Sequence, residues 1–535
     1  MNTVCRFLVK FSSLIVATLH CFDRVLFKGH LPLARATELE RFVDYFLGVR
    51  RSHFMKVLAP QYSDSLVAYA QRWARKTNRT FLYRAGSFRK DQWAEKILRE
   101  QRIDRGLVGI LCTMETCNSF SLEYAKQRPR FVSKPRRQRV LYYYFLDEQL
   151  GLIHVRLQTW APFTLQVCVN GHDWLAQQMA RLHMGFVLQR NAFTQLDQPV
   201  KAQRQADRFA TLDWTKILNR YARLVNPLLR KQLACQQPNW YVDQAEFATD
   251  LLFSSRAALS GLYQKLLQFA ALTFTPKDIY GFLGRKYNRC FNGELQTETK
   301  TDRHLGTRVK HRIKRNWLKM YDKFGLVLRI ETVINCPKDF AVRRTCYHRD
   351  GTTSQGYFPM RKNVASLVHY QEHAYACNRR YLDALAIVDD PTPAYQKLRQ
   401  LTEPKKVQGR SFAGFNPARR EDVRAFAAVL DGDAIARGFR NQDIRNTLFP
   451  PAPNSPDSIA TSTTKTRQKT RRPQSAEQRR RSAAIGRLLK RMHHRHWLAK
   501  IPRTRRWRVT EAGRQLLSLA IKHYTQTWTN LASLS

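Results

Sequence analysis

Three consecutive strand-like runs around residue 150 constrain the fold of this chain more than any other feature. Residues 140–146, 152–158 and 163–169 are rich in β-branched, aromatic and aliphatic side chains, and only short turns separate them. Strands joined this closely pair antiparallel, because a parallel pair needs a crossover of about a dozen residues or more. With helical spacing before and after them, these runs predict an α+β domain around an antiparallel sheet over residues 1–200.

The middle of the chain, residues 201–405, predicts a helical region combined with a second set of strands. Apolar residues three and four positions apart indicate helices over 211–231 and 244–271, and a third over 363–388. Between them, residues 305–345 change to strand-like composition and include a hairpin. We therefore expect an α+β multidomain protein in which this central domain also has an antiparallel sheet.

A low-complexity segment marks the last part of the chain. Residues 450–480 are rich first in Pro, Ser and Thr and then in Lys and Arg. Such a segment cannot bury a core and predicts disorder in the unbound chain. We interpret it as a disordered basic insertion in a third domain over residues 411–535.

The charge balance predicts a polyanionic partner. Lys and Arg total 92 against 41 Asp and Glu, a formal net charge of +51. Self-repulsion on this scale works against compactness, whereas each phosphate that a cation neutralises releases condensed counterions. We expect nucleic acid, DNA rather than RNA, and no membrane, since the sequence has no basic amphipathic anchor or lipidation motif. Ten cysteines without a Cys-x-x-Cys pair and without a secretory signal predict a reduced, cytoplasmic protein.

The C-terminal residues follow a helix–hairpin–helix pattern. Residues 483–494 have helical spacing, two short strand-like runs flank a basic turn, and Thr510 precedes a helix that runs to about residue 523. The segment from Leu498 to Arg514 resembles the wing of a winged-helix DNA-binding domain of the MarR or ArsR type. The resemblance implies earlier helices at residues 425–436 and 441–449.

The same resemblance implies which cations contact nucleic acid. A helix in the major groove needs cations on its outer face, and the tip of a wing needs arginines that reach the flanking backbone. The alternative is a winged helix that contacts proteins and whose charges are merely solvated. The candidate nucleic-acid-binding residues are Arg479, Arg480, Arg481, Arg487, Lys490, Arg491, Arg503, Arg505, Arg506 and Arg508.

Three acidic residues are candidates for catalysis. Phosphodiester cleavage or transfer needs carboxylates that gather divalent metal ions. In a chain this basic, Asp23, Glu115 and Glu331 stand out because each lies on or directly after an apolar strand. RNase H-like nucleases and transposases place carboxylates on successive strands in this manner, so we expect Mg²⁺ or Mn²⁺ at these three residues. The alternative is that each carboxylate pairs with a neighbouring arginine, such as Arg24 or Arg329, or faces solvent.

Tyr321 is a further candidate. The hairpin of residues 319–323 and 328–331 resembles a segment of rolling-circle replication initiators, in which a glutamate on such a strand helps hold a metal beside a tyrosine nucleophile. The resemblance implies Tyr321 as the nucleophile and Glu331 as the metal ligand. A purely structural tyrosine is the alternative.

Two weaker patterns complete the list of candidates. His369, His373 and Cys377 recur every four residues and share one stripe of a predicted helix, although one helix rarely supplies a whole metal site. The aromatic residues 142–145 follow a basic segment, 136–139, and could stack bases, with core packing as the alternative.

Taken together, the sequence favours a DNA-processing protein of a mobile genetic element, transposase-like or replication-initiator-like. The C-terminal domain would locate the site, and the remainder would act on the strand through a carboxylate-bound metal. The alternative is a non-catalytic DNA- or RNA-binding regulator or scaffold. Clustered carboxylates favour the enzyme, and dispersed, arginine-paired carboxylates favour the binder.

Overall fold

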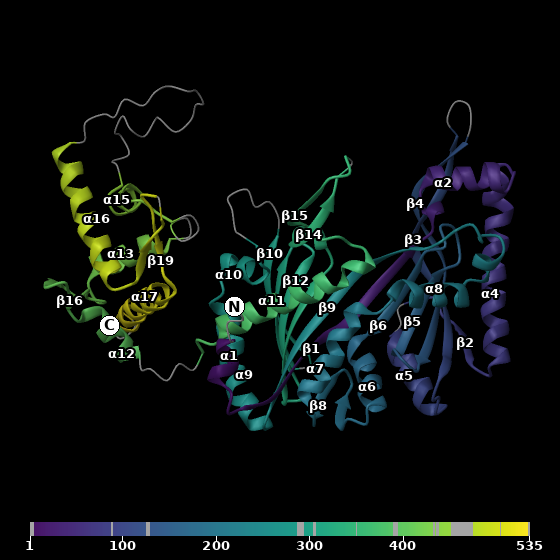
Figure 1. Cartoon of the computed structure of the whole chain (residues 1–535), viewed down its shortest axis with the longest axis horizontal. Coiled ribbons are helices and arrows are strands. Elements are labelled where there is room, and N and C mark those ends of the chain that lie inside the picture. Colours follow the sequence, from purple (N-terminus) through teal and green to yellow (C-terminus); the bar gives the residue numbers. More distant parts are fainter. Residues whose placement is uncertain are drawn as a thin grey trace. The chain divides into compact units, whose positions relative to one another are not determined.

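The structure is a computed structural model that describes residues 5–86, 89–124, 129–285, 294–302, 306–348, 350–388, 394–431, 434, 438–450, 475–502 and 504–532. The chain forms two compact units: unit 1 takes in residues 1–286 and 290–388, and unit 2 takes in residues 389–535. One large sheet, several small sheets and many helices (Figure 1) confirm the predicted α+β multidomain class. None of the helices in the described ranges is long and apolar enough to cross a membrane.

A sheet of eleven strands forms the body of unit 1, in the order β10-β11-β12-β13-β9-β1-β6-β5-β4-β3-β2. All neighbouring pairs are antiparallel except β2 and β3, which are parallel. Residues on both sides of position 200 thus belong to one sheet. Its strands are β1 Ile15–His30, β2 Thr80–Tyr83, β3 Gly106–Tyr124, β4 Pro129–Asp147, β5 Gly151–Gln158, β6 Leu165–Asn170, β9 Asn239–Phe253, β10 Leu295–Asp302, β11 Gly306–Ile313, β12 Asn316–Lys323 and β13 Val327–Ile334.

The sheet consists of two halves in which the strands follow the same order. In the first half, β1 is followed by helices and later by the meander β3-β4-β5-β6, whose last strand returns to pair with β1. In the second half, β9 is followed by helices and then by the meander β10-β11-β12-β13, whose last strand returns to pair with β9. The halves join through the antiparallel pair of β1 and β9, so each half supplies one central strand.

The helices of unit 1 precede, connect and follow these strands. Two hairpins, β7 Phe186–Gln189 with β8 Ala192–Leu196 and β14 Ala341–Tyr347 with β15 Thr353–Pro359, lie outside the large sheet. The helices are α1 Arg6–Lys10, α2 Ala36–Arg41, α3 Arg51–His53, α4 Ala59–Lys76, α5 Lys90–Glu100, α6 Gly171–Arg181, α7 Pro199–Arg208, α8 Trp214–Val225, α9 Arg256–Leu272, α10 Pro276–Phe282 and α11 Leu367–Leu385.

The two faces of the second half of the sheet differ in character. On β11 and β12, alternate residues such as Val309, Leu318 and Met320 are buried in the main core, where α9 contacts β11 and α11 contacts β13. The residues between them, such as Arg308 and Lys319, are half-buried and lie on the opposite face. Because side chains alternate along a strand, these strands present one apolar face to the core and one basic face away from it.

The helix predicted over residues 244–271 is wrong in its first part. Residues 239–253 form the central strand β9, and α9 begins at Arg256 after its cap, Ser255. From Ala245 to Phe253 every residue is buried. A strand buried on both faces shows no alternation, so periodicity alone cannot separate its apolar run from a buried helix.

Unit 2 has a core of its own, which includes Phe426, Leu489, Trp497 and Leu517. In its described part, four helices precede the last two-stranded hairpin and a long final helix, and a bridge from Phe439 to Trp507 adds one more extended segment beside this hairpin. The described elements are α12 Ala394–Thr402, β16 Lys405–Val407, β17 Arg410–Phe412, α13 Arg420–Leu430, α15 Asn441–Leu448, α16 Ala476–His494, β18 Leu498–Lys500, β19 Trp507–Val509 and α17 Glu511–Ala532.

Helix α16 starts earlier than the sequence indicated. Residues 476–480 were expected to lack structure, but they form its first turn, because Ser475 and Gln478 cap each other's backbone N–H groups. The remainder of the expected disordered insertion, residues 451–474, and Arg503 lie outside the described residues.

Candidate metal centre

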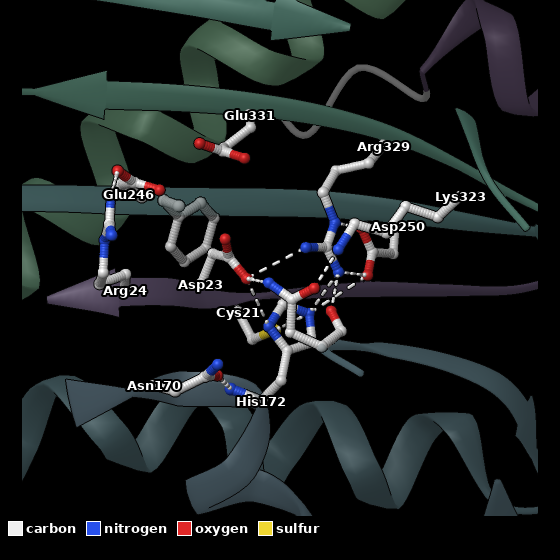
Figure 2. A network of polar contacts seen from close by, with 12 residues as sticks. Cys21, Asp23, Arg24, Asn170, His172, Glu246, Asp250, Lys323, Arg329 and Glu331 are labelled. Carbon is white, nitrogen blue, oxygen red and sulfur yellow. Dashed lines mark hydrogen bonds and ion pairs between the residues drawn. The ribbon is translucent and has the colours of Figure 1, made fainter. Parts of the chain in front are cut away.

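Three buried carboxylates from three neighbouring strands meet near the middle of the large sheet. Asp23 lies on β1, Glu246 on β9 and Glu331 on β13, and one oxygen of each lies within 4.8 Å of the other two. Figure 2 shows the three side chains converging from their strands. Their exposed fractions are 6%, 4% and 1%, so the group is almost closed to bulk water.

The register of the strands explains why these side chains share a face. Glu331 lies opposite Ala248 on β9, and Glu246 is two residues before Ala248, so the two glutamates point to the same side. Arg24 lies opposite Glu246, and the register of β1 shifts between Phe22 and Arg24. Asp23 occupies this irregularity, and a β-bulge of this kind re-aims a side chain that regular alternation would send to the other face.

Two cationic groups hold Asp23 together with a fourth buried acid, Asp250. Arg329, which is fully buried, places its Nη1 3.0 Å from Asp23 and its Nε 2.6 Å from Asp250. His172, in the first turn of α6, places Nδ1 3.1 Å from Asp23 and Nε2 3.2 Å from Asp250. Asn170 fixes the start of that helix by accepting a hydrogen bond from the His172 N–H. Burial alone lowers the pKa of His172, but the surrounding acidic groups raise it well above its usual value.

The two glutamates have other partners. Lys319, directly opposite Glu331 on β12, places its Nζ 2.6 Å from Glu331 and 3.9 Å from Glu246. Arg24 lies 2.6 Å from Glu246. The Tyr321 hydroxyl donates a hydrogen bond to the second oxygen of Glu331. Every carboxylate of the triad therefore has a cationic partner. The alternative interpretation of the sequence expected such partners, but for carboxylates that are dispersed.

Two members of the triad, Asp23 and Glu246, have pKa values that are shifted in opposite directions. Burial by itself raises the pKa of Asp23, but Arg329 and His172 outweigh it and hold this pKa far below its usual range. For Glu246, burial and the charge of Glu331 raise the pKa to about 7. The Glu246 carboxyl group therefore gains or loses a proton near neutral pH, and a divalent cation beside it would favour the ionised form.

The chemistry of this group suits a hard divalent cation. Carboxylate oxygens are the ligands that Mg²⁺ and Mn²⁺ prefer, and Mg²⁺ in proteins usually takes one or two carboxylates together with water and phosphate oxygens. The buried acidic triad could therefore hold a metal ion, in a position where Lys319 now neutralises two of its members. A metal with two positive charges would compete with this lysine for the same oxygens.

The structure brings together two of the three carboxylates that the sequence indicated, Asp23 and Glu331. The third, Glu115 on β3, belongs to another cluster: Lys90 lies 2.6 Å from one oxygen, and Arg156 lies 2.9 Å from the other. The Tyr142 hydroxyl also donates to Glu115, at 2.8 Å. Among the described residues, Glu115 is no member of the group that could hold a metal.

Glu246 takes the place that the sequence assigned to Glu115. It was missed because residues 244–271 were expected to be helical. A signal was present, since Glu246 and Asp250 are acids within the apolar run that ends at Phe253. Read as a strand, this run would have placed both acids on one face, four residues apart.

The two weaker candidates have structural partners. His373 contacts the carbonyl oxygen of Leu283 at 3.2 Å, and the buried Cys377 accepts from Arg380 at 3.3 Å. In the aromatic segment, Tyr143 and Phe145 are buried in the main core, whereas Tyr142 and Tyr144 lie on the other face, in the small core beneath α5.

The cations expected to contact nucleic acid in unit 2 fall into two groups. Arg481, Arg491 and Arg506 are half-buried, and Arg491 lies over the ring of Phe415 at 4.0 Å, so its guanidinium already has a structural partner. The others that the structure describes are exposed: Arg479, Arg480, Arg487, Lys490, Arg505 and Arg508.

No protein-family model, curated protein or solved structure matches this chain.

Proposed function

We propose that this protein binds nucleic acid and cleaves or transfers its phosphodiester bonds with a Mg²⁺ or Mn²⁺ ion held by Asp23, Glu246 and Glu331. One observation carries the proposal: three carboxylates from neighbouring strands meet on a face that continues into a basic surface on β11 and β12. A metal at such a triad would polarise a phosphoryl oxygen, and the cations beside it would attract the phosphate backbone.

The C-terminal unit supports a DNA partner in particular. Helices α13, α15 and α16, the hairpin of β18 and β19 and the bridge at Phe439 follow the order expected for a winged-helix domain. In this interpretation α16 is the recognition helix, with Arg487 and Lys490 exposed on it, and Arg505 belongs to the tip of the wing. DNA processing for a mobile genetic element is the activity that we infer from the two units together.

Tyr321 is the candidate nucleophile. Its hydroxyl donates to Glu331, so that carboxylate is placed to accept the phenolic proton as the oxygen attacks phosphorus. The bond from phosphorus to one sugar oxygen would break, and this oxygen would leave as a hydroxyl group. Burial and the charge of Glu331 raise the pKa of Tyr321, so this step needs a cation near the phenolic oxygen.

A cleavage assay tests the proposal. Labelled single- and double-stranded DNA and RNA would be incubated with the full chain and Mg²⁺ or Mn²⁺, with and without chelator. We expect metal-dependent cutting that Asp23→Asn, Glu246→Gln and Glu331→Gln each reduce at least about a hundredfold, as is typical for the loss of a group that acts on the transition state. Glu115→Gln is the matched control, a strand carboxylate with cationic partners outside the triad, and should cut normally.

The same assay separates the second candidate function, a non-catalytic binder, which the complete pairing of the triad with cations favours. Binding without cutting on all substrates would reject the enzyme. Cutting to the same extent by the triad variants and Glu115→Gln would reject the triad as its active site. A protein–DNA adduct that Tyr321→Phe abolishes would identify covalent strand transfer, whereas cutting by Tyr321→Phe would indicate hydrolysis by water.

A further inference from the structure

A cavity of about 380 Å³ lies in unit 1 next to the acidic triad. Two of its lining residues, Lys319 and Tyr321 on β12, are the same residues that contact Glu331. The lining also includes Lys300 on β10, Arg308 on β11 and Arg190 in the turn between β7 and β8. The cavity therefore opens on the basic face of the sheet, and the triad lies behind one of its walls.

The lining of this cavity is unusually cationic. Arg190, Lys300, Arg308, Lys319 and Lys323 line it, and the lining that the structure describes includes no carboxylate. Of these, Lys319 is neutralised by Glu331, but Arg190, Lys300 and Arg308 form no ion pair with any described residue. Cations that line one cavity repel one another, and a bound anion would offset this repulsion.

Arg308 adds an unmet hydrogen-bonding requirement. Its Nε is buried, and the atom has no hydrogen-bond partner. Buried donors without partners are rare in folded proteins, and each one calls for an explanation. An anion in the cavity would supply the acceptor, and the fork of a guanidinium group matches phosphate oxygens in particular.

The size and the aromatic lining narrow the class of ligand. The cavity lies within the usual volume range of small-molecule sites, so it has room for more than a bare phosphate ion. The ring of Tyr321 lies in the same lining and offers a surface for a sugar or a base. The combination of unpaired cations and a ring is suited to a nucleotide.

We propose that this cavity binds one nucleotide of a single strand, with its phosphate on Arg190, Lys300 and Arg308. This assignment of the ligand as part of a nucleic acid rests on the proposed function, and the site would hold the nucleotide next to the bond that is processed. The binding itself needs no metal and no cleavage. It can therefore be tested separately from the chemistry.

The test is calorimetric titration of the full chain with a 5′-phosphorylated tetrathymidylate in the presence of chelator. We expect Arg308→Gln and Lys300→Gln each to weaken binding about tenfold or more, because each removes a charge-assisted contact with phosphate. Lys310→Gln is the matched control: it lies on the same face of β11, two residues from Arg308, but pairs with Glu298 at 3.7 Å and does not line the cavity. Its affinity should equal that of the wild type.

The outcomes of this titration distinguish binding in the cavity from cleavage at the triad. Weakened binding in Arg308→Gln and Lys300→Gln, with normal binding in Lys310→Gln, supports the cavity whether or not the protein cuts DNA. Equal affinities in the wild type, Arg308→Gln and Lys300→Gln would overturn it, even if cleavage is observed. Lys300 lies on β10, the strand at the edge of the sheet, so Lys300→Gln can still test the cavity if Arg308→Gln folds poorly.

Discussion

At the scale of single residues, Arg329 determines how the acids around the triad can be buried. Its guanidinium has no exposure and contacts Asp23 and Asp250 at 3.0 and 2.6 Å. Burial alone raises the pKa of Asp250, yet Arg329 and His172 lower this pKa to about 2. Arg329 and His172 therefore keep Asp23 and Asp250 charged at neutral pH despite their burial.

Removal of Arg329 is expected to destabilise unit 1 strongly. Arg329→Met leaves two buried carboxylates without their main partner, which typically costs about 3–5 kcal/mol in the free energy of unfolding. Urea unfolding measures the loss. Lys96→Met is the control: the side chains of Lys96 and its partner Glu100 are 66% and 60% exposed, and a pair this open to solvent should cost about 1 kcal/mol or less. Equal losses in the two variants would show that burial does not govern the network.

The residues of the triad could be predicted from the sequence only in part. Asp23 and Glu331 could be selected because an acid on an apolar strand is costly unless it has a function or a partner. Glu246 was not added to them because its segment was expected to be helical, and the pairing of β1 with β9, which brings it to Asp23, joins residues more than two hundred positions apart. Such contacts leave no local pattern in the sequence, so Glu115 was grouped with the triad instead.

At the scale of elements, the junction of β6 and α6 delivers His172 to the triad. Asn170 ends the strand and caps the helix, and Gly171 is the first residue of the helix. A Cβ atom at Gly171 would overlap the carbonyl group of Phe22, the residue before Asp23. The close approach of α6 to β1 therefore requires glycine at this position.

Gly171→Ala is expected to lower the free energy of unfolding by about 1–3 kcal/mol, because the new methyl group forces two backbone segments apart. Thermal or urea unfolding would measure this change. Gly261→Ala in α9 is the matched control, since nothing lies within 4 Å of its added Cβ. Helix propensity should leave that variant unchanged or up to about 1 kcal/mol more stable. A Gly171→Ala variant as stable as Gly261→Ala would contradict the proposed packing.

The elements themselves were predictable where the hydrophobic period is clear. The strands β5 and β6 and the helix α11 match the predicted runs closely, since alternation or helical spacing marks each of them, whereas the run predicted at 140–146 is only the last part of β4. The central strand β9 was mistaken for a helix because its second half is buried throughout. Hydrophobic periodicity thus predicts secondary structure least well for a strand that is buried on both faces.

At the scale of the whole molecule, the candidate site lies at the junction of the two similar halves of the sheet. Asp23 comes from the first strand of one half and Glu246 from the first strand of the other, while Glu331 lies on the last strand of the second half. Neither half alone contains the triad. Any function of this group therefore depends on the pairing of β1 with β9.

The two units have cores without a common residue, so we expect two separate unfolding transitions.

His311 is fully buried in unit 1 and contacts the Tyr381 hydroxyl at 3.0 Å. Burial lowers its pKa from 6.5 to about 4. Below pH 6.5 the unfolded chain binds this proton more readily than the folded chain, so acidification favours unfolding of unit 1. From pH 7 to pH 5 this one group should remove about 2 kcal/mol of its stability.

His311→Gln should therefore reduce the loss of stability between pH 7 and pH 5 by about 2 kcal/mol in one transition only, because all other titrating groups are shared with the wild type. Calorimetry at both pH values measures this difference. Phe426→Ala, in the core of unit 2, should lower the free energy of unfolding of that unit, measured in the other transition, by about 3–5 kcal/mol at either pH. If both variants shift the same transition, the two units unfold as one, and the separate cores do not act independently.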